Sequence, residues 1–321
     1  MLQSCTWDEP RVHINDSTDF QAFKNPQLLI KQAYSAGDKR LRAATVLPDN
    51  AEWGVICNQT YLSVRDLSQN GEHINIARLV YNSTIAVYFL GLTGSRFPYY
   101  KNEMPVEELM MVPLPSEIST KELEDFYSID KVVMQAFSLT EAEKITIDDF
   151  LQLTLPDALR KTVGLARKPT QRIKSEPALA AYVQTLIRVL KGTFGKDKEV
   201  NATIYQEANN EYLPVRMITL HFGWPGRQLL TVEPIAADGL YDLLGAFAHK
   251  TLRNAGVNDE GIGIQRVAYL FHSVQTEQGK VRSLSIIKPD ERRYWARSIA
   301  LRDADDLGAA ILKAAGWKGV S

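Results

Sequence analysis

Four short segments between residues 27 and 66 restrict what the start of this chain can form. Each is rich in β-branched or aromatic residues: QLLIKQ (27–32), LRAATVL (41–47), WGVIC (53–57) and TYLSVRD (60–66). Residues that favour turns separate them, at 35–38 and 48–50. This alternation predicts short strands joined by turns. A further strand is expected over 108–115, where prolines end it.

A helical pattern lies between these strands. Its apolar residues are three, four or seven positions apart: Ile76, Leu79, Val80, Val87 and Leu90. The spacing predicts one helix over 75–93, ended by Gly91 and Gly94. Because apolar residues surround much of its circumference, we expect this helix to be buried.

The second half of the chain predicts a different arrangement. From Ser119 onward the pattern is helical, with a helix over 146–160 and a linker over 164–174. Helices and strands then follow in the order α-β-β-β-α-β-β-α: 178–190, 200–207, 215–223, 228–236, 239–253, 266–274, 281–288 and 303–315.

These patterns together predict an α+β fold in four parts. The parts are an N-terminal arm (1–26), a strand-rich domain with a buried helix (27–116), a helical connector (117–174) and a C-terminal α/β sandwich-like domain (175–321). The length of 321 residues is sufficient for two domains of ordinary size.

Charge and cysteine content exclude several classes of protein. The 37 Lys and Arg residues are balanced by 38 Asp and Glu residues, which excludes a strongly basic coat but not a local basic face. Two cysteines exclude a disulfide scaffold and a cysteine-rich zinc site. The chain begins without a secretory signal, and its longest apolar stretch (85–92) is too short for a membrane span. We therefore expect a cytoplasmic protein.

The sequence predicts no catalytic residue, metal or cofactor in this chain. It has no phosphate-binding glycine loop, Walker lysine, HExxH motif or GxSxG motif. Asp303, Asp305 and Asp306 have the chemistry to ligate a hard cation. Acids at the start of a helix are better explained by the helix dipole.

Side chains suited to DNA are frequent before residue 116. Arg and Lys neutralise phosphates, Asn and Gln pair with adenine edges, and tyrosines stack on bases. The candidates for DNA binding are Lys31, Lys39, Arg40, Arg42, Asn58, Gln59, Tyr61, Arg65, Arg96, Tyr99, Tyr100 and Lys101.

The order of these patterns resembles the region downstream of the catalytic domain in N6-adenine DNA methyltransferases of restriction-modification systems. The matching elements are LLIKQ, GVICNQ, LVYNSTIAVYF and MMVPLP, all within residues 27–115. In that family the region is a target-recognition segment, so the resemblance implies contact with double-stranded DNA.

The catalytic part of the family is missing from this sequence. The motif Asn/Asp-Pro-Pro-Tyr/Phe does not occur, since Gln27 follows Asn25-Pro26. The loop that holds the methyl donor is also missing. The resemblance therefore implies a specificity module that works with a separate methyltransferase or another restriction-modification subunit, in a restriction or phage-defence setting. S-adenosylmethionine is expected only in that catalytic partner.

A second basic group lies in the C-terminal part. A helix starting near Pro289 would place Arg293 and Arg297 on one face, with Arg292 beside Trp295. We predict that these three arginines contact DNA phosphates. The alternative is an arginine face paired with acids above a buried tryptophan.

Two other functions stay open at this point. The C-terminal domain is a candidate metal-dependent nuclease, with Glu233, Lys288 and either Asp303 or Asp305 as its active groups. It is also a candidate protein-interaction subunit that docks onto other members of a defence complex.

Overall fold

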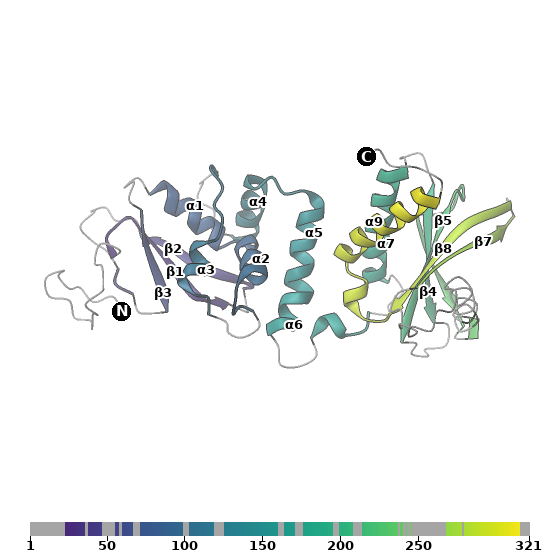
Figure 1. Ribbon diagram of the computed structural model, residues 1–321, viewed down its shortest axis with the longest axis horizontal. Helices are drawn as coiled ribbons and strands as arrows, with labels where there is room; N and C mark the ends of the chain where they lie inside the picture. Colours follow the sequence, from purple (N-terminus) through teal and green to yellow (C-terminus); the bar gives the residue numbers. More distant parts are fainter. Residues whose placement is uncertain are drawn as a thin grey trace. The chain divides into compact units, whose positions relative to one another are not determined.

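The computed structural model describes residues 23–35, 38–46, 55–57, 60–66, 71–98, 103–118, 125–159, 164–170, 176–194, 199–207, 214–236, 238–239, 242, 245, 268–277 and 279–314. The chain divides into two compact units, Met1–Leu159 and Arg160–Ser321 (Figure 1). Each unit combines helices with its own β-sheet, which confirms the predicted α+β class. The boundary lies within the segment 117–174, which the sequence predicts as a connector.

Unit 1 is built on a three-stranded antiparallel sheet. Its strands, in the spatial order β2-β1-β3, are β1 (Gln27–Ser35), β2 (Arg40–Val46) and β3 (Tyr61–Arg65). Leu28 and Ile30 are buried and stand opposite Val64 and Leu62, so one face of the sheet lines the core. Of the strand predicted over 53–57, the described residues are not in a strand.

Two helices replace the single helix predicted over 75–93. They are α1 (Glu72–Tyr81) and α2 (Thr84–Thr93), bent by 72°. At the break, the Asn82 side chain accepts a hydrogen bond from the Ala43 amide at 3.1 Å and donates one to the Ala43 carbonyl at 2.7 Å. The chain turns here because Asn82 binds the main chain of the edge strand β2.

A short helix, α3 (Val106–Met110), stands where the sequence predicts a strand over 108–115. That prediction is wrong. Leu109 and Val112 are buried, whereas the two methionines between them are exposed. A spacing of three residues between buried positions is the period of a helical turn and not the alternation of a strand.

Three more helices lie in the described part of unit 1. They are α4 (Phe126–Ala136), α5 (Glu141–Asp149) and α6 (Leu155–Leu159), with the π-helical turn η2 (Phe150–Thr154) before α6. A Cβ atom on Gly91 would lie 2.4 Å from the Phe150 ring. Gly91 therefore permits close packing of α2 and does not end it, since the helix continues to Thr93.

The core of unit 1 contains the apolar residues of α1 and α2. Val80 and Val87 are both 0 % exposed, which confirms that the predicted helical segment is buried. Among the described residues, no single helix is long and apolar enough to cross a membrane, and α1 and α2 meet that length and composition only as a bent pair.

The described residues of unit 2 form a five-stranded sheet and two long helices. Its elements are α7 (Pro177–Phe194), β4 (Val200–Glu207), β5 (Val215–Phe222), β6 (Leu230–Ile235), β7 (Ala268–Thr276), β8 (Gly279–Pro289) and α9 (Arg297–Ala314). The spatial order is β6-β4-β5-β8-β7. These strands and helices confirm the predicted order, whereas most of the helix predicted over 239–253 lies outside the described residues.

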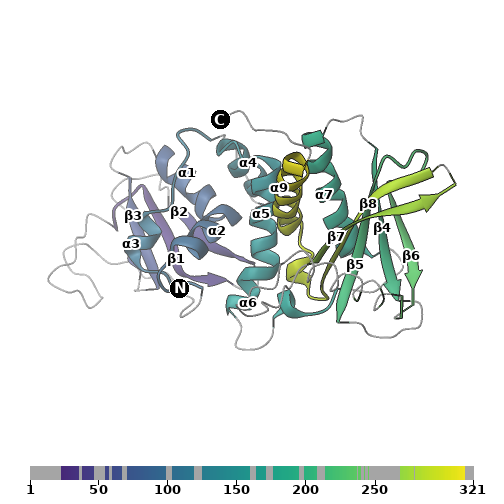
Figure 2. The same cartoon turned by 45° about the vertical axis from the view of Figure 1, so that its right-hand side comes forward.

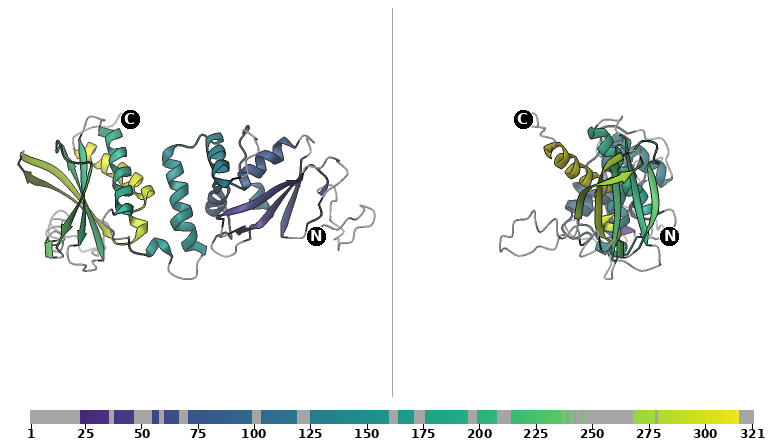
Figure 3. Two further views of the ribbon diagram at one scale, coloured as in Figure 1. Left: turned by 180° about the vertical axis from the view of Figure 1, so that it is seen from behind. Right: turned by 90° about the vertical axis from the view of Figure 1, so that its right-hand side faces the viewer.

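The sheet of unit 2 has two different faces. Helices α7 and α9 lie together against one of them (Figure 2), and the view from behind agrees (Figure 3). Apolar residues such as Ala202, Ile218 and Leu220 form a core with these helices. The alternate residues of the strands are buried polar groups on the opposite face, among them Thr203, Thr219, His221, Ser283 and Ser285.

Two short 3-10 helices belong to unit 2, η3 (Leu165–Arg167) and η4 (Arg292–Tyr294). The helix predicted to start near Pro289 is therefore wrong, because α9 begins only at Arg297. Pro289 is still paired with Val215 at the end of the sheet. The Asp290 amide is held there too, since it donates to the Pro214 carbonyl at 2.9 Å.

Candidate nucleic-acid interface

A row of three side chains crosses the sheet of unit 1. Lys31 of β1 pairs with Arg42 of β2 on one side and with Tyr61 of β3 on the other. Directly paired residues point to the same face of a sheet. This is the face opposite to the buried side chains of Leu28 and Ile30. The structure thus brings together three residues that the sequence predicts to bind DNA.

Arg65 lies on the same face, at the other end. It pairs with Gln27, four residues from Lys31 and so about 13 Å along the strand. The Gln27 amide is buried and donates to the Val55 carbonyl and the Ser63 hydroxyl, each at 2.7 Å. The row around Lys31 is the more open end, since Tyr61 is 41 % exposed.

Asp38 neutralises part of this row. Its carboxylate accepts hydrogen bonds from the Ser35 hydroxyl at 2.7 Å and from the Arg42 guanidinium at 2.6 Å. These two bonds lower the pKa of Asp38 below its usual value. Within the described part of the chain, Lys31 has no carboxylate partner. Lys39 is exposed in the turn beside Asp38, with a φ of 56°.

Arg40 differs from the other candidates because it belongs to the interior. Its guanidinium forms a two-pronged ion pair with Asp130 of α4, at 2.8 and 2.5 Å, and donates to the Asn82 carbonyl at 3.0 Å. Asp130 in turn accepts the amide of Thr84 at the start of α2. The structure gives Arg40 a role in holding α4 and α2 to the sheet, so we leave it out of the DNA interface.

The connection after α2 exposes Arg96 and buries Phe97. The Phe97 ring contacts the Tyr34 ring at 5.3 Å, so it fills the core. Arg96 lines a cavity of about 350 Å³ with Gln32, Glu103 and neighbouring residues. Gly94 has a φ of −68°, so the turn does not use the left-handed conformation that glycine allows.

Five predicted DNA contacts lie outside the described residues. They are Asn58, Gln59, Tyr99, Tyr100 and Lys101.

Two of the three C-terminal arginines belong to η4, and the third follows it. Arg292 donates from Nε to the Pro169 carbonyl at 3.4 Å. Arg293 pairs with Glu291 at 2.7 Å, and Arg297 is the first residue of α9. Trp295 is buried, as both interpretations of the sequence expected.

The residues of the alternative nuclease site do not all come together. Lys288 and Asp303 form a buried ion pair on the helix-covered face of the sheet, where Asp303 also accepts from Tyr182. Burial lowers the pKa of Lys288. Glu233 lies on the other face, where it pairs with Arg227. No group of acidic, histidine or cysteine residues within the described ranges is arranged to hold a metal ion.

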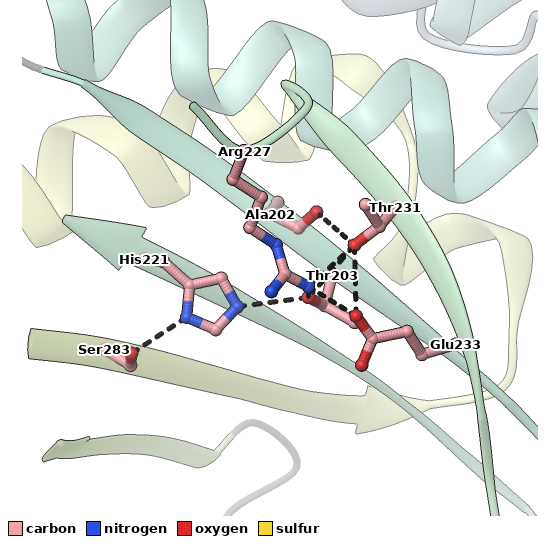
Figure 4. A network of polar contacts seen from close by, with 7 residues as sticks. All are labelled: Ala202, Thr203, His221, Arg227, Thr231, Glu233 and Ser283. Carbon is pink, nitrogen blue, oxygen red and sulfur yellow. Dashed lines mark hydrogen bonds and ion pairs between the residues drawn. The ribbon is translucent and has the colours of Figure 1, made fainter. Parts of the chain in front are cut away.

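The sequence analysis did not predict a polar network on the unit 2 sheet. This network lies on the face of the sheet away from α7 and α9 (Figure 4). The His221 ring lies between two hydroxyls, with Nδ1 2.9 Å from Ser283 Oγ and Nε2 3.1 Å from Thr203 Oγ1. Arg227 donates to Thr203 Oγ1 at 2.6 Å and pairs with Glu233.

A neutral His221 satisfies this network. Because Thr203 Oγ1 accepts from Arg227, its own proton is available for His221 Nε2, and the Nδ1 proton then goes to Ser283. Burial, followed by the charge of Arg227, lowers the pKa of His221 to about 4. With 2 % exposure and both ring nitrogens engaged, His221 is a structural residue. Strand alternation places Thr203 and His221 on one face, but it does not show that this face is buried.

Comparison with known proteins gives no relative from which a function could be transferred. No family model, no curated protein and no solved structure matches this chain significantly.

Proposed function

We propose that this chain is a DNA-binding specificity module that acts with a separate N6-adenine methyltransferase of restriction-modification or phage-defence type. The observation that carries the proposal is the row of Arg42, Lys31 and Tyr61 across the three strands of unit 1. The row combines two cations that suit phosphates with one aromatic ring that suits a base or sugar.

The charge on this row favours an anionic ligand. Lys31 and Arg42 stand directly opposite each other, and like charges in that position destabilise a sheet. Asp38 compensates only Arg42, through the bond at 2.6 Å. A phosphate above the row would interact with both cations at once and remove their mutual repulsion. Arg65 lies on the same face, at the other end of β3.

The methyltransferase partner rests on the resemblance of residues 27–115 to target-recognition segments. In this arrangement the chain selects the DNA site, and the partner holds S-adenosylmethionine and transfers the methyl group. Arg96 is a further candidate contact, since it is exposed beside Gln32, whose amide is suited to an adenine edge.

Duplex binding at several salt concentrations tests the proposal. We expect Lys31→Ala and Arg65→Ala each to reduce the slope of log K against log salt by about one, because each lost phosphate contact releases fewer counterions. Lys131→Ala is the matched control, since Lys131 is an exposed cation on α4. Well-folded variants with the wild-type slope would contradict the proposal.

A second experiment addresses the partner. Calorimetry with S-adenosylmethionine should detect no binding to this chain alone, and a methylation assay should require an added methyltransferase subunit. Micromolar binding of the methyl donor by the isolated chain would show that it carries its own catalytic site.

A further inference from the structure

Two basic segments of unit 2, far apart in sequence, meet at η3 and η4. The Arg292 amide donates to the Lys168 carbonyl at 3.0 Å. The Arg292 side chain donates from Nε to the Pro169 carbonyl, 123 positions away in sequence. Arg167 and Lys168 are exposed, so the junction gathers their charges beside that of Arg292.

The acids around this junction are already engaged. Asp290 accepts from the Thr170 amide at 3.0 Å and from its hydroxyl at 2.7 Å. Glu176 pairs with Arg216 at 2.7 Å, and both side chains are 0 % exposed.

Glu291 is the remaining acid of η4, and it pairs with Arg293 at 2.7 Å. Within the residues that the structure describes, Arg167, Lys168 and the terminal nitrogen atoms of Arg292 have no carboxylate partner. The surface is therefore positive because its acids are buried or neutralised, although the whole chain has a net charge of −1.

We infer that Arg167, Lys168 and Arg292 form a second surface for the DNA phosphate backbone, on unit 2. This inference rests on the proposed function and extends it beyond the sheet of unit 1. The Pro169 carbonyl holds Arg292 at Nε, which leaves the two terminal nitrogens to donate to a phosphate. Helix α9 begins at Arg297, three positions after the end of η4, and its N-terminal end carries partial positive charge.

The test compares variants of the full chain in duplex binding over a range of chloride concentrations. The test variant is Arg167→Ala/Lys168→Ala/Arg292→Ala. The control variant is Arg188→Ala/Lys280→Ala/Arg282→Ala, which removes the same charge from exposed positions on α7 and the far end of β8. Both are also made in the background Lys31→Ala/Arg65→Ala, and a thermal melt confirms that each variant is folded.

We expect the test variant to reduce the salt slope by about one for each lost phosphate contact, in both backgrounds. The control variant should keep the slope of its parent. An unchanged slope in the test variant, or an equal loss in the control, would overturn this inference. If Lys31→Ala/Arg65→Ala lowers the slope and the test variant does not, the proposed function stands without this second surface. If only the test variant lowers it, the second surface stands and the sheet face is not the interface.

A last arm separates the nucleic-acid backbone from free phosphate. Inorganic phosphate replaces chloride at equal ionic strength. We expect the two salts to weaken duplex binding equally for wild type and test variant. If phosphate competes more strongly than chloride, and only in the wild type, the junction is a site for the free ion and the inference is wrong.

Discussion

Lys31 and Arg42 stand directly opposite each other on antiparallel strands, and among the described residues an acid, Asp38 at 2.6 Å, lies beside Arg42 alone. Within the described part of the chain, nothing balances the charge of Lys31. Two like charges in this position cost stability. A sheet that keeps them is expected to gain stability from an anion bound over them.

Replacing Lys31 with glutamate should separate folding from binding. Lys31→Glu creates an opposite-charge pair with Arg42 across the strands, so we expect the free energy of unfolding to rise by about 0.2–1 kcal/mol. Duplex affinity should fall at the same time, because a carboxylate repels phosphates. A thermal melt and a binding titration measure the two effects, and Lys31→Ala shows how much comes from losing the lysine alone. A variant that is more stable and still binds DNA like the wild type would count against the interface.

Removing Arg40 should destabilise unit 1 without a specific effect on DNA. Its partner Asp130 would be left as an uncompensated, mostly buried carboxylate at the start of α2. We expect Arg40→Ala to lower the free energy of unfolding by about 3 kcal/mol, as measured by chemical denaturation. Arg42→Ala, two positions further along β2 and 51 % exposed, should cost less than about 1 kcal/mol. Equal costs for the two variants would show that the ion pair of Arg40 with Asp130 contributes no more to the free energy of unfolding than an exposed pair.

Changing Asn82 to aspartate tests the bend between α1 and α2. The Asn82 amide nitrogen donates to the Ala43 carbonyl at 2.7 Å and to the Arg78 carbonyl at 3.0 Å. Asn82→Asp loses both donors and places a negative charge near two carbonyls, so we expect a loss of about 1–3 kcal/mol. Denaturation at pH 7 measures it, and a loss that becomes smaller when the carboxyl is protonated at low pH would support the explanation, because a carboxylic acid restores one of the two donors. No loss at either pH would mean that the bend does not depend on these bonds.

Gly91→Ala should force a conflict with Phe150. The added methyl would lie 2.4 Å from the ring, so one of the two must move, at a cost of about 1–3 kcal/mol. Phe150→Leu removes the aromatic ring that is in the way. In that background Gly91→Ala should cost much less, and a double-mutant cycle from thermal melts gives the difference. Costs that simply add would show that Phe150 is not the obstacle.

His221 should make the stability of unit 2 depend on pH. The pKa of His221 is lowered to about 4 in the fold, whereas an unfolded histidine has a pKa of about 6.5. Between these values the unfolded chain binds a proton and the folded chain does not, so stability falls as the pH drops from 6.5 toward 4 and this contribution levels off below 4. The full effect is at most about 3 kcal/mol. Unfolding curves from pH 7.5 to 4 for wild type and His221→Gln isolate it, and parallel pH profiles would contradict the neutral buried histidine.

Local patterns in the sequence determine most of the elements. Strand β4 has the predicted bounds, and α7, β5 and β8 differ from theirs by a few residues at the ends. In these segments the alternation or the helical spacing of apolar residues continues over eight or more residues. Such a pattern identifies a strand or a helix from the sequence alone. The buried character of Val80 and Val87 was predictable for the same reason.

Tertiary structure decided what local patterns leave open. Asn82 bends the predicted helix because Ala43, 39 positions away, offers its main chain. Arg40 and Arg42 look equivalent in sequence, yet only Arg40 meets a carboxylate from α4. The same holds for the hydrogen bond between Lys168 and Arg292 and for the hydrogen bonds of His221. Each joins segments that are far apart in sequence and meet only in the fold. The sequence determines the charge and size of each side chain, but its role depends on which residues, distant in sequence, the fold places in contact with it.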